Sequence, residues 1–207
     1  MDASREINRF WFGASPAAVE SLRALGKLWF GIGASSEERI AIDELIRSRF
    51  GEAIERAATG RLTTWADSPH RRLSLILLLD QFPRHVYRGT ARAFATDREA
   101  LALTLTGIQA AADVTLSPVE RIFFYMPLQH AELPEAQEES LAAYRRLLAE
   151  APAALRPLFA SSLEAAERHH DVVTRFGRFP HRNQVLGRPS TSVEQAYLAR
   201  GGQRFDR

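Results

Sequence analysis

Helix-start signals recur along this chain, and no segment between them alternates apolar and polar residues as a half-buried strand would. In Ser117-Pro118-Val119-Glu120, a capping serine is followed by proline at the first helical position and by glutamate at the third. The same spacing of hydroxyl and glutamate recurs in Ser35 with Glu38, Thr96 with Glu99 and Thr191 with Glu194. A capping serine followed by proline, without the glutamate, occurs in Ser15-Pro16 and Ser68-Pro69. We therefore expect a helix to begin at each of these positions.

Two segments between these signals have the apolar pattern of buried helices. Residues Leu73–Leu79 are apolar on every side of a helix, but the run is far shorter than the roughly 20 residues that cross a bilayer, so we expect a central core helix. The last long helix is expected from about Ala153 to Phe176, ending at Gly177. Its apolar stripe includes His170, which predicts that this histidine faces the core.

The succession of helices with short loops predicts the fold class. We expect an all-α fold of about seven to nine helices, packed as antiparallel helical hairpins. The 207 residues fit a single domain, 1–207, with a tail that frays from about residue 201. The N-terminal sequence MDASREINRFWFG has no apolar run of the kind that precedes a signal-peptide cleavage site, so we expect a cytoplasmic protein with no membrane segment.

Composition and motifs exclude several kinds of site. The chain has no cysteine, which excludes disulfides, thiolate zinc sites, iron–sulfur clusters and a cysteine nucleophile. The patterns GxSxG and GxGxxG and the phosphate-binding loop pattern do not occur. A formal net charge of only +2 gives no reason to expect a nucleic-acid partner. No tight set of metal ligands is present, so we predict no metal site and assign no cofactor.

Asp80 is unusual because it directly follows the apolar run Leu73–Leu79. A carboxylate near a helix C-terminus opposes the helix dipole, and beside a buried segment it also carries a desolvation cost, so it requires a partner. Arg84 and Arg88 follow closely, and Pro83 is expected to turn the chain out of the helix. Two interpretations are open: a structural ion pair that pins the loop to the core, or one wall of a pocket.

The segment from Arg168 to Arg188, RHHDVVTRFGRFPHRNQVLGR, contains five arginines and a single acid, Asp171. Arginine binds phosphate or carboxylate oxygens in a bidentate manner, and the helix start at 190–192 could add free backbone N–H donors. The segment therefore predicts a site for a small anion. The alternative is that these arginines pair with acids elsewhere in the fold, such as Asp80, Asp97 and Glu132, and residue spacing does not separate the two.

The histidines of this region are candidates for proton transfer, because a nearby carboxylate is enough to tune an imidazole. His170 is favoured by its expected inward position, and His181 follows the turn after Gly177. The alternative for His170 is a core histidine that bonds a backbone carbonyl.

Four segments carry a family resemblance. They are FWFG near the N-terminus, LLDQFPRHVYRGTARAFATD from Leu78 to Asp97, FFYMPLQHAE from Phe123 to Glu132, and HHDVVTRFGRFPHRNQVLGRPST from His169 to Thr191. In this order they resemble the bacterial domain-of-unknown-function family 924 over nearly the whole chain. The resemblance implies an all-α fold related to the tetratricopeptide-like helical superfamily and supplies no established activity. His85 departs from the family pattern, which usually has asparagine at this position.

Our leading hypothesis is a polar pocket that binds a small anionic molecule and supports acid/base chemistry on it. The predicted ligand-binding residues are Arg84, Arg175, Arg178, Arg182, Asn183, Asp80, Asp97 and His130, and the candidates for proton transfer are His170 and His181 with Asp171 to orient them. The second hypothesis is a tetratricopeptide-like interaction module, in which the same network only locks the helices together and a concave surface binds a peptide or protein.

Overall fold

The computed structural model describes residues 2–14 and 19–205, apart from the side chains of residues 19–23. Within these ranges the chain forms helices and turns and no strand. The α-helical segments are α1 (Ala3–Phe12), α2 (Val19–Phe30), α3 (Ser36–Ala58), α4 (Pro69–Ile76), α5 (Phe82–Val86), α6 (Asp97–Gln109), α7 (Pro118–His130), α8 (Pro134–Glu150), α9 (Arg156–Phe176) and α10 (Ser192–Ala199). A π-helical turn, Leu77–Gln81, joins α4 to α5. The described part of the chain thus has nine separate helices, which confirms the predicted all-α fold with seven to nine helices.

Capping boxes begin α3, α7 and α10, as predicted. The hydroxyls of Ser35, Ser117 and Thr191 accept the backbone N–H three residues further on, and the glutamates at that position accept the N–H of the capping residue. α4 begins at Pro69, as expected, but the predicted cap is wrong in that the Ser68 side chain makes no capping hydrogen bond. The start expected at Ser15-Pro16 lies outside the described residues.

The capping box predicted at Thr96 is wrong, although α6 does begin directly after it, at Asp97. The Thr96 hydroxyl instead donates a hydrogen bond to the backbone oxygen of Leu79, at 2.6 Å. Leu79 lies four residues before Pro83, which has no N–H to donate back to it. Thr96 therefore supplies a hydrogen bond that the helix itself cannot make.

The expectation that Pro83 turns the chain out of the helix is also wrong. The π-helical turn Leu77–Gln81 widens the helix, and the N–H of Phe82 donates to the oxygen of Leu77, five residues back. The helix then continues through Pro83 as α5. The run Leu73–Leu79 is buried throughout, so the prediction of a core helix is confirmed.

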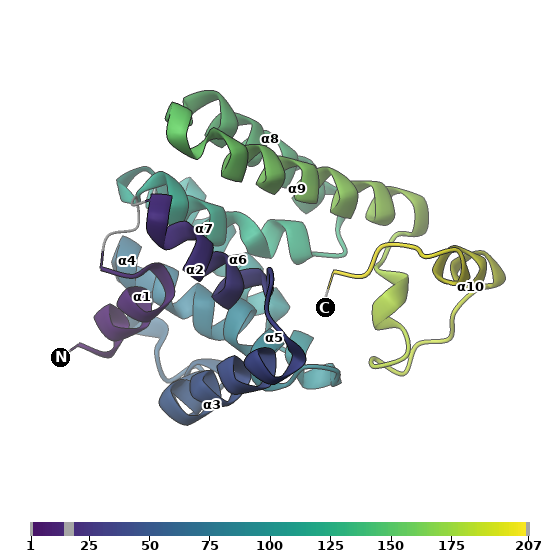
Figure 1. Cartoon of the computed structure of the whole chain (residues 1–207), viewed down its shortest axis with the longest axis horizontal. Helices are drawn as coiled ribbons and strands as arrows, with labels where there is room; N and C mark the ends of the chain where they lie inside the picture. Colours follow the sequence, from purple (N-terminus) through teal and green to yellow (C-terminus); the bar gives the residue numbers. More distant parts are fainter. Residues whose placement is uncertain (1, 15–18, 206–207) are drawn as a thin grey trace.

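The long helix α9 ends as predicted. Its last residue is Phe176, and Gly177 follows in the left-handed conformation with a φ of 68°. Its expected first residues form a separate 3₁₀ turn, Ala153–Leu155, and α-helical geometry begins at Arg156. α9 packs against α8, and the two lie beside α7 on one side of the molecule (Figure 1).

α10 and the residues around it form one end of the molecule, drawn in yellow in Figure 1. The segment expected to fray, from about residue 201, returns toward α9, where the ring of Phe205 stacks on His169 with 3.6 Å between ring centroids. The main core includes an aromatic cluster around Trp11, Phe82 and Phe123. None of the described helices is long and apolar enough to span a bilayer.

Thr96→Val is expected to lower the free energy of unfolding by about 1–3 kcal/mol, because the oxygen of buried Leu79 loses its hydrogen-bond partner while the side-chain shape is nearly kept. Chemical denaturation of the variant and the parent protein measures the difference. Thr90→Val is the control, since the Thr90 hydroxyl bonds the Tyr87 oxygen in an exposed turn where water can replace it. An equal loss in both variants would contradict the role assigned to Thr96.

Candidate functional site

A cavity of about 480 Å³ lies between α2, α3, α5, α7 and α9. Part of its wall is apolar and includes Phe30 of α2, Met126 of α7 and Leu158 of α9. Phe205, from the C-terminal segment, adds a further ring. A volume of this size accommodates a small molecule.

Positive charge dominates the polar part of the wall. Among the described residues that line the cavity, the cationic side chains are Lys27, Arg39, Arg84, Arg88 and Arg168, and the one carboxylate is that of Asp43. A cleft lined mainly by charges of one sign raises the local concentration of oppositely charged molecules. The described lining of the cavity therefore carries more positive than negative formal charge.

Asp80 lies behind this wall, in the π-helical turn, and is completely buried. Its carboxylate accepts a hydrogen bond from Gln81, lies 2.8 Å from Nδ1 of His130 and lies 3.2 Å from Arg84. Burial by itself raises the pKa of Asp80, but the charge of Arg84 and the hydrogen bonds from His130 and Gln81 outweigh it and hold the pKa below its usual value. Asp80 is therefore ionised, and the partner that the sequence required is present.

The contact with Asp80 also determines the tautomer of His130. An ionised carboxylate only accepts hydrogen bonds, so Nδ1 of His130 carries the proton that it donates, and Nε2 is left as an acceptor. Burial, and then the charge of Arg84, lower the pKa of His130, so the ring is neutral at pH 7. A neutral imidazole oriented by a buried carboxylate has the arrangement of a general base.

A second Asp–His pair lines the cavity where α3 meets α5. Nδ1 of His85 lies 2.7 Å from Asp43, and Arg88 donates two hydrogen bonds to the same carboxylate. Burial raises the pKa of Asp43, but the hydrogen bonds from His85 and Arg88 lower it further than burial raises it.

The prediction that His170 faces the core is wrong, because His169 occupies that position. His169 is 5% exposed, its Nδ1 donates to the Ala165 oxygen at 2.7 Å, and its ring lines the cavity. His170 is one residue further, about 100° around the helix, and its Nε2 bonds Glu138 of α8 at 2.8 Å on the outer side. The core histidine bonded to a backbone carbonyl is thus His169. Burial lowers the pKa of His169 well below its usual value.

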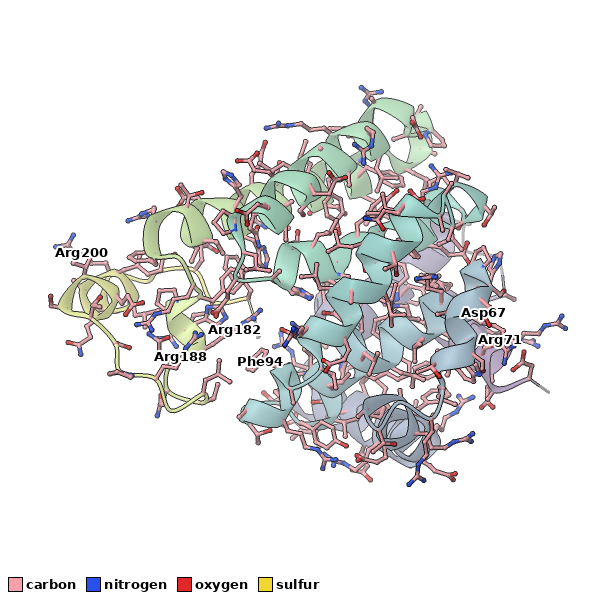
Figure 2. All side chains as sticks on the ribbon, turned by 180° about the vertical axis from the view of Figure 1, so that it is seen from behind. Asp67, Arg71, Phe94, Arg182, Arg188 and Arg200 are labelled. Carbon is pink, nitrogen blue, oxygen red and sulfur yellow. The ribbon has the colours of Figure 1, made fainter. Side chains whose placement is uncertain are left out.

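Arginines of the Arg168–Arg188 segment pair with acids of the fold. The pairs are Arg175 with Asp171, Arg178 with Glu194, Arg182 with Asp97, and Arg188 with Glu132. Arg182 is only 4% exposed and lies over the ring of Phe94, as Figure 2 shows. Burial lowers the pKa of Arg182 to about 10, which still leaves it charged at pH 7.

Asp97 connects this segment to the cavity. Its two carboxylate oxygens accept hydrogen bonds from Arg84 at 2.8 and 2.9 Å, and one of them also accepts from Arg182 at 3.3 Å. Arg84 in turn contacts Asp80. Alternating charges therefore link the central helix to the C-terminal segment.

The structure places only part of the predicted site at the cavity. Arg84 and His130 line it, and Asp80 and Asp97 bond them from behind. The other predicted residues are not among its lining residues: Arg175, Arg178, Arg182, Asn183, His170, His181 and Asp171. Asn183 donates to the Ser190 hydroxyl, and His181 packs against Phe179 and Phe205.

The cavity lining also includes Arg39, Asp43, Gln129 and His169, which are not among the site residues predicted from the sequence. Arg39 and Asp43 stand alone in an ordinary helical pattern, so no local motif marks them. Gln129 and His169 lie in two of the segments that carry the family resemblance, next to the predicted His130 and His170.

Comparisons with known proteins give a family and no activity. A family model described as a bacterial protein of unknown function, DUF924, matches residues 7–202. The solved structure of a protein of unknown function from Agrobacterium tumefaciens has a TM-score of 0.75 and 36% sequence identity, over 96% of this chain and 97% of that chain. No curated protein matches the chain.

Asp97→Asn is expected to lower the free energy of unfolding by about 3–5 kcal/mol, because buried Arg182 loses its carboxylate partner and Arg84 loses one of two. Urea denaturation measures the loss. Asp171→Asn is the control, since its exposed pair with Arg175, one helical turn apart, should contribute only about 0.3–0.5 kcal/mol. A loss below about 1 kcal/mol for Asp97→Asn would show that the buried network does not need this charge.

Protein stability is expected to fall below about pH 6.5, because His169 is neutral in the folded protein and takes up a proton near that pH when unfolded. A group with a lowered folded-state pKa contributes its full stability above its unfolded pKa and loses up to about 1.4 kcal/mol per pH unit below it. His130 should add to the same loss.

His169→Gln is expected to reduce this slope between about pH 6.5 and 5, as measured by urea denaturation at a series of pH values. An unchanged slope in His169→Gln would contradict the assignment of this loss to His169.

Proposed function

Because this chain belongs to the DUF924 family of bacterial proteins of unknown function, we propose its function from its own cavity: it binds a small anionic molecule that carries a phosphate or carboxylate group. The observation that carries the proposal is the excess of cationic side chains over carboxylates around a cavity of about 480 Å³. Small-molecule sites commonly have volumes of about 300–1,000 Å³.

Two of the cavity arginines are oriented by carboxylates. Arg84 is bonded by Asp97, and Arg88 is bonded by Asp43. A side chain that is already ordered loses little conformational entropy when it binds a ligand. Arginines that are held in this way favour an anion of one shape and orientation over others.

Two other cavity arginines, Arg39 and Arg168, have weaker contacts with carboxylates than Arg84 and Arg88 have. Arg39 donates to the backbone oxygen of Gly31, and Arg168 lies 4.0 Å from Glu164, at the outer limit of an ion pair. A guanidinium fork matches the oxygens of a phosphate or carboxylate. We assign direct contact with the anion to these two residues first.

Acid/base chemistry on the bound molecule is the second part of the proposal. His130 supports it, because Asp80 orients the ring and Nε2 is free to accept a proton as a neutral imidazole does. His130 replaces His170 and His181 as the proposed base, since neither of those is among the residues that line the cavity.

We assign the paired arginines of the C-terminal segment to holding that segment in place. Arg178, Arg182 and Arg188 each have a carboxylate partner within 3.3 Å. The interaction-module hypothesis gave this structural role to the whole network, and we limit it to the C-terminal part.

A thermal-shift screen of phosphorylated metabolites, nucleotides and dicarboxylates tests the proposal, with calorimetric titration of the best binder. An anion at 100 times its dissociation constant is expected to stabilise the protein by about 2.7 kcal/mol. Arg39→Ala and Arg168→Ala are each expected to raise that constant about tenfold or more, because a hydrogen bond to a charged group contributes about 1.5–3 kcal/mol.

Arg175→Ala is the matched control, because Arg175 is on the same helix as Arg168 and is similarly exposed, but is not among the cavity residues. It also separates this proposal from the sequence prediction, which placed Arg175 at the anion. The proposal is wrong if no anion stabilises the parent protein, or if Arg175→Ala weakens binding while Arg39→Ala and Arg168→Ala do not.

A further inference from the structure

Beside its cationic side chains, the cavity has a polar region on α7 and α9 whose hydrogen-bonding capacity is not used within the described chain. Gln129, on α7, is 5% exposed and lines the cavity. Its amide oxygen Oε1 is buried with no hydrogen-bond partner. A buried polar atom left unsatisfied costs about 1–3 kcal/mol, so its presence at a cavity points to a ligand.

His169, on α9, presents a second acceptor of this kind. Its Nδ1 donates to the Ala165 oxygen, so the other ring nitrogen, Nε2, carries the lone pair of the neutral ring. Nε2 is buried and has no hydrogen-bond partner among the residues that the structure describes. The ring cannot satisfy this atom by protonation, because burial opposes the imidazolium form.

His130 adds a third acceptor from the same region. Its Nδ1 is committed to Asp80, its ring lines the cavity, and the centroids of the His130 and His169 rings are 5.9 Å apart. Gln129 is the adjacent residue on α7. Three acceptors thus come from neighbouring positions on two packed helices.

Acceptors on the protein require donors on the ligand, and the kinds of donor are limited. A carboxylate oxygen has no proton to donate at neutral pH, and a phosphate monoester, whose second pKa is about 6, is then mostly without one. An ammonium group does, but five cationic side chains line the same cavity and would repel it. An uncharged donor meets neither obstacle, and the hydroxyl group is the simplest of these.

We infer that the anion bound in this cavity carries hydroxyl groups, as a hydroxy acid or a sugar phosphate does, and that Gln129, His130 and His169 accept hydrogen bonds from them. This inference rests on the proposed function and specifies its ligand class. The arginines would bind the anionic group, and the α7 and α9 acceptors would select the hydroxylated part.

Calorimetric titration with matched pairs of anions tests the inference. The pairs are glycerol 3-phosphate with n-propyl phosphate, glucose 6-phosphate with n-hexyl phosphate, and malate with succinate, so that each pair differs mainly in its hydroxyl groups and the pairs separate phosphates from carboxylates. In at least one pair the hydroxylated member is expected to bind the parent protein tenfold or more tightly, because sites with buried acceptors discriminate strongly against analogues that lack the donor.

His169→Phe is expected to reduce that preference to threefold or less while the anion without hydroxyls binds as before. Gln129→Met, which keeps the side-chain length, is the second variant and covers the case in which His169→Phe does not fold. His170→Phe is the matched control, since its ring is outside the cavity, and should keep the full preference.

Equal binding of both members in every pair would overturn the inference and leave the proposed anion site standing. Tighter binding of the members without hydroxyls would also overturn it. If no anion of either kind binds, the proposed function itself fails. An unchanged preference in both His169→Phe and Gln129→Met would show that these side chains do not select the hydroxyl groups.

Discussion

The carboxylate of Asp80, completely buried in the central helix, is the constraint on which the rest of this structure depends. A charge taken from water into a protein interior costs several kcal/mol unless partners compensate it. Arg84 and His130 compensate Asp80, Arg84 in turn bonds Asp97, and Asp97 holds the buried Arg182. Loss of any member removes a partner from a neighbouring buried group, so the network favours one relative arrangement of the helices that carry these residues.

The same network shapes the cavity. Arg84 and His130 each contact a buried carboxylate on one side and line the cavity on the other. The sequence left open whether Asp80 belongs to a structural ion pair or to a pocket wall. The structure combines the two, because Asp80 forms the ion pair and its partners form the wall. A ligand that binds these partners would therefore meet side chains whose orientation the fold already determines.

Much of the helical architecture could be predicted, because capping and termination depend on residues a few positions apart. The caps at Ser35 and Ser117 and the end at Gly177 are of this kind. The errors have another origin. Thr96 lies where it could cap its own helix, but its hydroxyl donates to the backbone oxygen of Leu79, 17 residues away. Pro83, four residues after Leu79, has no N–H to donate to that oxygen. The assignment of His170 to the core was wrong because adjacent residues differ by about 100° around a helix. An apolar stripe that is placed one residue out of register exchanges His170 with His169.

By itself the sequence determined the helices, most of their ends and the need of Asp80 for a partner, since each follows from the chemistry of neighbouring residues. Tertiary structure alone decided which side chains form the cavity, because Asp43, Gln129 and His169 come from three different helices and no spacing along the chain relates them. It also decided that the arginines of the C-terminal segment meet carboxylates of the fold. Arg182 and Asp97 are 85 residues apart, and a contact over that separation depends on how the helices pack.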